Sequence, residues 1–118
     1  MAISDNTLTT LKTPPHSIEA EQFLLGGILL DENAFDYIGG VLFPKHFYRK
    51  EHQIIFEHIS KLKAENKNVD AVTVAESLKL NNQLEYTGGI DYLHNLVEST
   101  VSSTNIQSYA EIIRERFI

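Results

Sequence analysis

Cysteine is absent from the 118 residues of this sequence. The protein therefore has no disulfide framework, no thiolate nucleophile and no cysteine-based zinc site. No apolar run approaches the roughly 18 residues that a membrane-spanning helix requires. The first residues also lack the basic flank and apolar stretch of a signal peptide. These absences favour a protein of the cytoplasm, where thiols are kept reduced.

Positive charge is scarce, because 10 Lys and Arg residues face 16 Asp and Glu residues and the formal net charge is -6. This sign is opposite to that of a surface that grips duplex DNA. We expect the basic clusters to lie on solvated helix faces. They are Lys45, Arg49 and Lys50; Lys61, Lys63 and Lys67; and Arg114 and Arg116. Because Tyr86, Tyr92 and Tyr109 do not alternate with these residues, a platform for stacking single-stranded bases is also disfavoured.

Motifs that bind phosphates or carry out catalysis are missing as well. The chain has no G-x-x-x-x-G-K-[ST] or G-x-G-x-x-G loop, no H-E-x-x-H and no G-x-S-x-G. We therefore predict no catalytic, cofactor-binding or metal-binding residue in this chain. The strongest candidate against that prediction is the trio Asp91, His94 and Glu98, whose spacing could place a metal ligand set or a proton shuttle on one helix face. The same spacing is common on solvated helix faces, and we favour that interpretation.

Three further histidines, His46, His52 and His58, recur every six residues. On a helix each such step turns by about 240°, so these side chains cannot converge on one metal ion. His52 shares the predicted core face of its helix with Ile55 and Phe56. We expect it to be half-buried and hydrogen-bonded.

Apolar residues recur at helical spacing along most of the chain, which predicts an all-α fold, a compact bundle of about six helices. A Thr-rich stretch without periodicity comes first. We expect residues 1–13 to be a disordered leader and residues 14–118 to form the helical domain. The expected helices cover residues 18–30, 32–38 and 49–66, and three more begin after Asp70, after Gly88-Gly89 and near residues 102–104.

Two adjacent glycines, Gly26 and Gly27, interrupt the first expected helix. Each costs about 1 kcal/mol relative to alanine in a helix interior. We attribute them to a close helix crossing that a β-carbon would obstruct, with a functional hinge as the alternative.

The last expected helix keeps its pattern to the final residue without a stop signal. We therefore expect the chain to be a piece of a longer protein. On this hypothesis Ile54, Phe117 and Ile118 are buried in a subunit contact.

Two side chains lie off the predicted apolar stripes and are candidates for binding a partner protein. Glu19 points away from the stripe of Ile18 and Leu25, and Tyr92 lies beside the stripe that begins at Leu93. An exposed aromatic residue near acids can anchor a partner. We expect Glu19→Lys and Tyr92→Ala to weaken such binding and to leave thermal stability unchanged.

Several segments, in the same order, resemble the N-terminal domain of DnaB-type bacterial replicative helicases. They are Pro14-Pro15-His16-Ser17-Ile18-Glu19-Ala20-Glu21-Gln22 with Leu25-Gly26 and Leu30-Asp31; Phe47-Tyr48 with His52, Ile55 and Phe56; Val69-Asp70 with Val72-Thr73-Val74; Leu84-Glu85 with Gly88-Gly89 and Tyr92-Leu93; and Asn105 with Tyr109-Ala110 and Ile113-Arg114. The resemblance covers about residues 14–118. The chain departs from the family pattern in its longer Thr-rich leader and at residues 66–68, where a glycine is usual.

The resemblance implies a compact helical head that, in the full protein, precedes a helical hairpin, a linker and a RecA-like ATPase. Members of this family form hexameric rings that use ATP and Mg²⁺ to translocate on single-stranded DNA at the replication fork in the bacterial cytoplasm. For this chain it implies a non-catalytic domain that supports ring assembly and binds primase, with a helicase loader as a further candidate partner. Glu19 and Tyr92 are then expected on the primase-facing side. ATP, Mg²⁺ and single-stranded DNA would be bound by the motor domain, which is absent from this sequence.

Two other classes stay open on the residues alone. A stand-alone helical adaptor or regulator fits the missing catalytic motifs, and an enzyme would depend on Asp91, His94 and Glu98. The reading frame after Ile118 distinguishes them, since the helicase interpretation requires a G-x-x-x-x-G-K-[ST] motif downstream.

Overall fold

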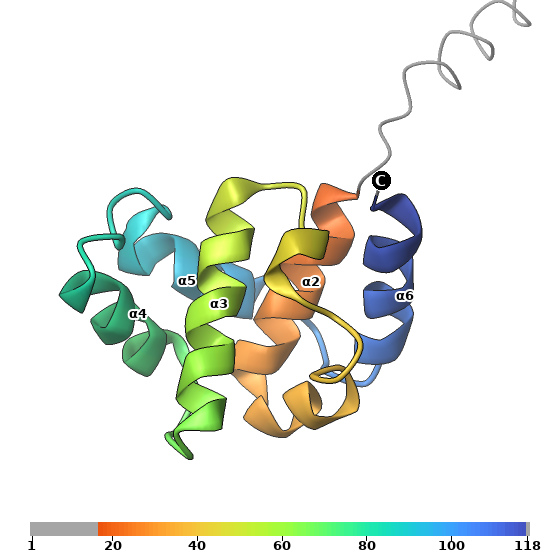
Figure 1. The fold of residues 1–118 in the computed structure, drawn as a ribbon, viewed down its shortest axis with the longest axis horizontal. Coiled ribbons are helices and arrows are strands. Elements are labelled where there is room, and N and C mark those ends of the chain that lie inside the picture. The colour runs from red at the N-terminus through yellow and green to blue at the C-terminus, as the bar shows by residue number, and fades with distance from the viewer. Residues whose placement is uncertain (1–16, 118) are drawn as a thin grey trace, which may run out of the picture.

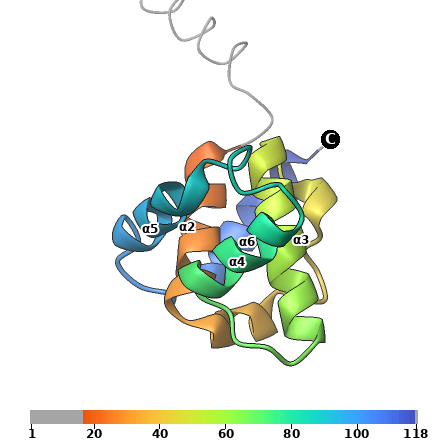
Figure 2. The same cartoon turned by 90° about the vertical axis from the view of Figure 1, so that its left-hand side faces the viewer.

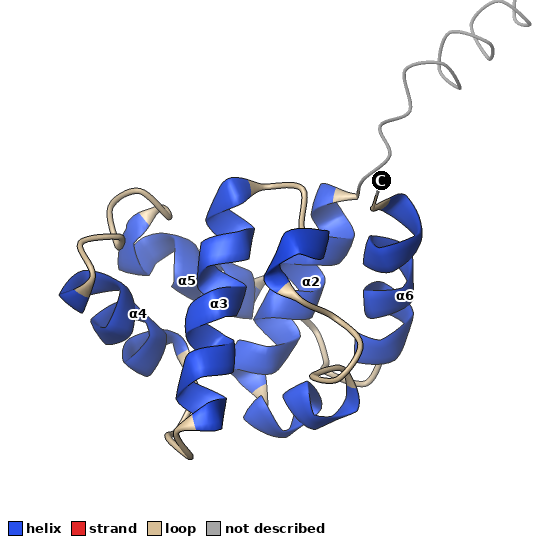
Figure 3. Cartoon of the chain, viewed as in Figure 1, coloured by secondary structure: helices blue, strands red, loops and turns tan. Residues whose placement is uncertain are grey.

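The computed structural model describes residues 17–117, and every regular element in that range is a helix (Figures 1 and 3). Five of these elements are α-helices and two are short 3₁₀ helices. In chain order they are α2 (Ile18–Leu30), η1 (Glu32–Tyr37), η2 (Pro44–His46), α3 (Lys50–Ala64), α4 (Ala71–Leu80), α5 (Gly89–Glu98) and α6 (Ile106–Arg116). The predicted all-α fold is confirmed. The expected leader and Ile118 lie outside the described residues.

Helix α2 lies at the centre of the fold and contacts α3, α5, α6 and η1. Figures 1 and 2 show these elements on different sides of it. Its sequence explains this position, because apolar residues and glycines fill almost every place after the first turn. Leu24, Leu25 and Ile28 are completely buried. The helix begins at a Ser17 cap, whose side chain accepts a hydrogen bond from the Ala20 N–H at 3.2 Å.

One of the two adjacent glycines in α2 allows a neighbouring helix to approach its backbone closely. A β-carbon on Gly26 would overlap the Leu96 carbonyl oxygen and the Thr100 hydroxyl at the end of α5. A β-carbon on Gly27 would lie 3.4 Å from the Ile106 side chain at the start of α6, which is ordinary contact. The expected close crossing is therefore confirmed at Gly26, and it fixes how near α5 lies to α2.

The segment expected as a helix over residues 32–38 is a 3₁₀ helix, η1, over Glu32–Tyr37. Asp31 caps it by accepting a hydrogen bond from the Asn33 N–H at 3.1 Å. Phe35 anchors it through a tilted ring contact with Phe56 of α3, with ring centroids 5.8 Å apart. A short element of this kind gains its stability from such packing rather than from helix propagation.

Two helix ends differ from the expected boundaries. Helix α3 ends at Ala64, because Asn66 adopts a left-handed conformation with φ 59° and the Lys67 N–H returns to the Leu62 carbonyl at 2.9 Å. Asparagine tolerates this conformation, so the missing glycine noted at residues 66–68 leaves the fold unchanged. The expectation that the last helix runs through residue 118 is wrong for Phe117, which is extended and packs its ring on His46.

Candidate protein-interaction surface

A buried polar network joins α2, α3 and α5. The Glu21 carboxylate, 1% exposed, accepts from the Tyr48 N–H at 2.6 Å and from Nδ1 of His52 at 2.7 Å. The Arg49 N–H donates at 3.4 Å to Oε1, the oxygen that His52 also contacts, whereas the Tyr48 N–H donates to Oε2. Tyr48 and Arg49 immediately precede α3, so the carboxylate caps the positive end of that helix as well as lying in the first turn of its own. Glu21 thereby ties the first turn of α2 to the start of α3.

The network continues from His52 to Tyr92 of α5. Since a carboxylate only accepts, Nδ1 of His52 donates to Glu21, and its Nε2 lies 2.6 Å from the Tyr92 hydroxyl. That hydroxyl also accepts from the Gln22 amide at 3.3 Å. The hydroxyl proton is therefore available to Nε2, and a neutral imidazole satisfies every bond in the chain. The expectation of a half-buried His52 is wrong in degree, because the ring is 0% exposed.

The two predicted partner-binding residues belong to α2 and α5, which pack against each other. Glu19 is exposed in the first turn of α2, and Gln22, one turn later on the same helix, contacts Tyr92. Tyr92 is half-buried and uses its hydroxyl internally. The structure revises the expectation for Tyr92→Ala: we now expect this change to lower stability, because it would leave the buried His52 without its second hydrogen bond.

The alternative catalytic trio lies on the outside of α5, where Asp91, His94 and Glu98 are all exposed. Within residues 17–117 no group of three or more His, Cys, Asp or Glu side chains is placed to hold a metal ion. In the same range no helix is both long and apolar enough to cross a membrane. The arrangement of the trio is that of solvated helix residues.

The three histidines with six-residue spacing lie in separate environments. His58 is 3% exposed and bridges Ser77 and Gln83, each at 2.7 Å, which ties α3 to α4 and the turn after it. His46 accepts from the Phe43 N–H through Nδ1 at 2.9 Å. Burial, and after it the charges of Arg114 and Lys45, lower the pKa of His46.

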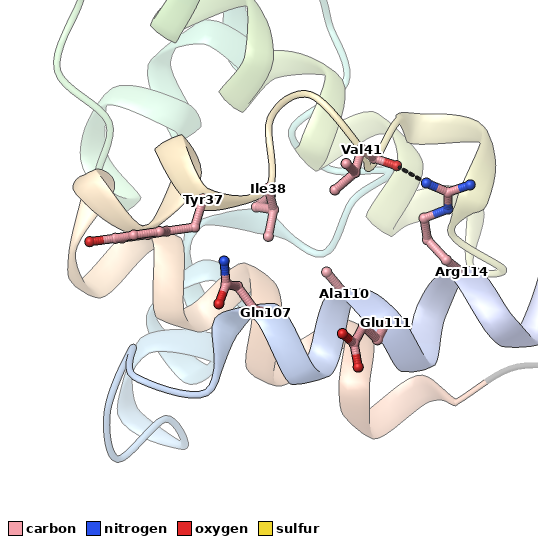
Figure 4. A pocket seen from close by; sticks show the side chains of 7 residues that line it. All are labelled: Tyr37, Ile38, Val41, Gln107, Ala110, Glu111 and Arg114. Atoms are coloured by element: carbon pink, nitrogen blue, oxygen red, sulfur yellow. Dashed lines mark hydrogen bonds between the residues drawn. The ribbon is translucent and has the colours of Figure 1, made fainter.

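A shallow groove of about 480 Å³ separates α6 from the segment that joins η1 to η2. Figure 4 shows Ala110 and Ile38 on its floor, with Tyr37 and Gln107 at one end and Arg114 at the other. The Arg114 guanidinium donates to the Val41 carbonyl at 2.9 Å and so closes that end. Tyr37 and Val41 are 66% and 47% exposed, which leaves apolar surface available beside the groove.

Two features of this region were not predicted from the sequence: the buried network of Glu21 and the approach of Lys45 and Arg114 to His46. Glu21 looked like an ordinary acidic residue of a first helical turn, and nothing in its spacing pointed to Tyr48 or His52. Lys45 and Arg114 looked like members of separate solvated clusters, although the fold brings both residues near His46. The one available signal was the apolar position of His52, which required a polar partner inside the core.

Comparisons with known proteins agree with this architecture. A family model described as the DnaB-like helicase N-terminal domain matches residues 13–115. The replicative DNA helicase DnaB of Buchnera aphidicola subsp. Baizongia pistaciae is 39% identical over 112 residues, which cover 95% of this chain and 24% of that protein. The DnaB of Pasteurella multocida is 42% identical over 105 residues, covering 89% of this chain and 22% of its own length. The chain thus spans about a quarter of these relatives.

A solved structure shows the same fold. The crystal structure of the N-terminal domain of DnaB helicase from Mycobacterium tuberculosis superposes with a TM-score of 0.84 at 38% identity, covering 87% of this chain and 72% of that one. The likeness therefore extends over most of both chains. Together with the family match over residues 13–115, it establishes that this chain belongs to the DnaB-like helicase N-terminal domain family.

Proposed function

We propose that this domain is a non-catalytic interaction module of a replicative DNA helicase, which supports ring assembly and binds primase. The observation that carries the proposal is the match of nearly the whole chain to the N-terminal quarter or so of proteins named replicative DNA helicases. The full protein would unwind duplex DNA at the bacterial replication fork, in the cytoplasm, as a ring hexamer.

The chemistry of this chain supports a division of labour with the rest of the protein. The sequence has no phosphate-binding loop, and its net charge of -6 opposes DNA binding. We assign ATP, Mg²⁺ and single-stranded DNA to a motor domain outside this chain. The helical head would then act through contacts with neighbouring subunits, with primase and with a helicase loader.

The surface of Glu19 and Tyr92 is the proposed primase-facing side. Glu19 is exposed and forms no ion pair within the described residues, so a basic residue of a partner can reach its carboxylate. Part of the Tyr92 ring is exposed to solvent, while its hydroxyl is hydrogen-bonded to the buried His52. A rigid aromatic residue beside a carboxylate is the composition expected of an interface anchor.

The test is a titration of residues 1–118 with the primase of the same organism. Glu19→Lys should weaken primase binding by about tenfold or more, because the carboxylate that faces a basic residue of the partner is replaced by a cation that repels it. Glu76→Lys, the same change at an exposed position of α4, is the matched control and should bind as the parent does. Unaltered binding by Glu19→Lys, or an equal loss with Glu76→Lys, would move the primase site elsewhere.

The non-catalytic role has its own measurement. Residues 1–118 should hydrolyse no ATP above background and should bind DNA no more tightly than in the nonspecific micromolar range. Robust hydrolysis by this chain would contradict the proposal, whatever the result with primase.

A further inference from the structure

Residues from two distant segments form a mixed surface where η2 meets the end of α6. The Phe117 ring packs edge-on against His46, with centroids 4.9 Å apart, and the Phe43 ring lies on the same histidine at 5.9 Å. Lys45 is the neighbour of His46 in η2, and Arg114 is one turn before Phe117 in α6. We call Phe43, Lys45, Arg114 and Phe117 the aromatic–basic patch. His46 lies beneath it, 8% exposed.

The patch is open to solvent. Phe43 and Phe117 are 47% and 44% exposed, although both are phenylalanines. Lys45 and Arg114 are also exposed, and within the described residues neither forms an ion pair with an acid. The Arg114 guanidinium is held in place by its bond to the Val41 carbonyl (Figure 4).

The charge of the patch is opposite to that of the domain. Both of its cations act on the same imidazole, since both lower the pKa of His46. Arg49 lies near in sequence but is paired with Glu51 at 3.2 Å, which lowers the pKa of that carboxyl. Glu111 lines the groove beside Arg114 and marks the acidic edge of the surface. The patch therefore carries two cations without an acidic partner among the described residues, in a chain whose net charge is -6.

We propose that the aromatic–basic patch binds an acidic segment of a partner protein that also carries an apolar side chain. The two phenyl rings supply a contact for the apolar side chain, and the two cations supply partners for flanking carboxylates. Arg114 is pre-oriented by its bond to Val41, which reduces the entropy lost on binding. The adjoining groove of about 480 Å³ offers room for the backbone of the segment.

A protein segment suits this surface better than a nucleic acid does. Two cations would displace only about two counterions from a phosphate backbone, which gives weak affinity. The remaining surface of an acidic domain would repel the rest of a long polyanion. A short acidic peptide contacts the patch alone and avoids that repulsion. The inference is independent of the proposed primase contact, which uses Glu19 on α2.

The test uses residues 1–118 and a short fluorescent peptide of glutamates and phenylalanines, followed by anisotropy at low and moderate salt. We expect binding that weakens as salt rises. Lys45→Glu should weaken it by about tenfold, and Phe117→Ala should weaken it without changing its salt dependence. Lys61→Glu, the same charge change at an exposed position of α3, is the matched control and should have no effect. Glu111→Lys should tighten binding, because it extends the positive surface.

Three results would overturn the proposal. The first is a failure of the peptide to bind. The second is an equal loss with Lys61→Glu and Lys45→Glu, which would show general charge attraction. The third is an oligothymidylate that binds more tightly than the peptide with the same dependence on Lys45, which would make the patch a nucleic-acid site. Thermal melting of each variant checks the fold, and Phe43→Ala replaces Phe117→Ala if the latter unfolds.

Discussion

His52 and His46 are six residues apart and both are buried, yet their surroundings are opposite in charge. His52 is enclosed by the core and donates to the carboxylate of Glu21 at 2.7 Å. His46 lies just under the surface, accepts from the Phe43 N–H, and has Arg114 and Lys45 as its charged neighbours. The first histidine links three helices, whereas the second supports an exposed patch.

This contrast shows how one residue type serves two purposes in a small domain. A buried imidazole needs hydrogen-bond partners, and the identity of these partners and of the charged groups nearby decides what the site can do. At His52 both partners are internal, so the site is fixed and contributes to stability. At His46 the two neighbouring cations, Lys45 and Arg114, are exposed and remain available to a binding partner.

The largest effect in either region is expected from Glu21→Ala. It removes the acceptor of the Tyr48 N–H and of His52 at a position that is 1% exposed. We expect a loss of about 3–5 kcal/mol in the free energy of unfolding, because at least two donors lose their acceptor and each unsatisfied buried group costs about 1–3 kcal/mol. Chemical denaturation measures it, with Glu19→Ala on the same helix as the exposed control.

Glu21→Gln sharpens the same comparison, because it keeps the size and one acceptor oxygen while it removes the charge. A smaller loss than for Glu21→Ala would show that the charge and the hydrogen bonds contribute separately. If Glu21→Ala were as stable as Glu19→Ala, the network would have no role in stability and the contrast between the two histidines would fail.

A smaller effect is expected from Tyr92→Phe. The change keeps the ring and removes the hydroxyl that lies 2.6 Å from Nε2 of His52 and accepts from Gln22. We expect a loss of about 1–2 kcal/mol, from one buried nitrogen left without its partner. Combining Tyr92→Phe with Glu21→Ala should cost less than the sum of the two single changes, since both act through His52. Strict additivity would show that the two bonds are independent.

The helices and their inner faces were predictable from the sequence because each follows from local pattern. Ser17 and Asp70 are N-caps as expected, and Leu24, Leu25 and Ile28 occupy the core at their helical spacing. The close crossing at Gly26 was predictable because a glycine inside a helix needs a steric reason, and the fold supplies one in Leu96 and Thr100.

The polar network and the patch could not be predicted, because each depends on residues far apart in the chain. Glu21 meets a residue 31 positions later in His52, and Arg114 meets Val41 from 73 positions away. Helical periodicity reports which face of an element is buried, but it does not report which elements meet there. The same limit made Tyr92 look like a free surface residue.

The smallest effect is the pH dependence contributed by His46, and it tests the contrast most directly. In the folded protein, burial and the charges of Arg114 and Lys45 hold the pKa of His46 below its ordinary value of 6.5. A proton could bind Nδ1 only if the bond from the Phe43 N–H broke. As the pH falls below about 6.5, the His46 side chain of the unfolded protein takes up a proton while that of the folded protein stays neutral. The contribution of His46 to the free energy of unfolding is therefore fully present above this pH and is lost as the pH falls to the lower pKa of the folded protein.

His46→Gln removes this contribution, and its free energy of unfolding, measured by chemical denaturation, should fall less than that of the parent over the same range. An equal fall in both proteins would show that His46 is not held neutral by its surroundings. The opposite charges around the two histidines would then have no effect on how stability depends on pH.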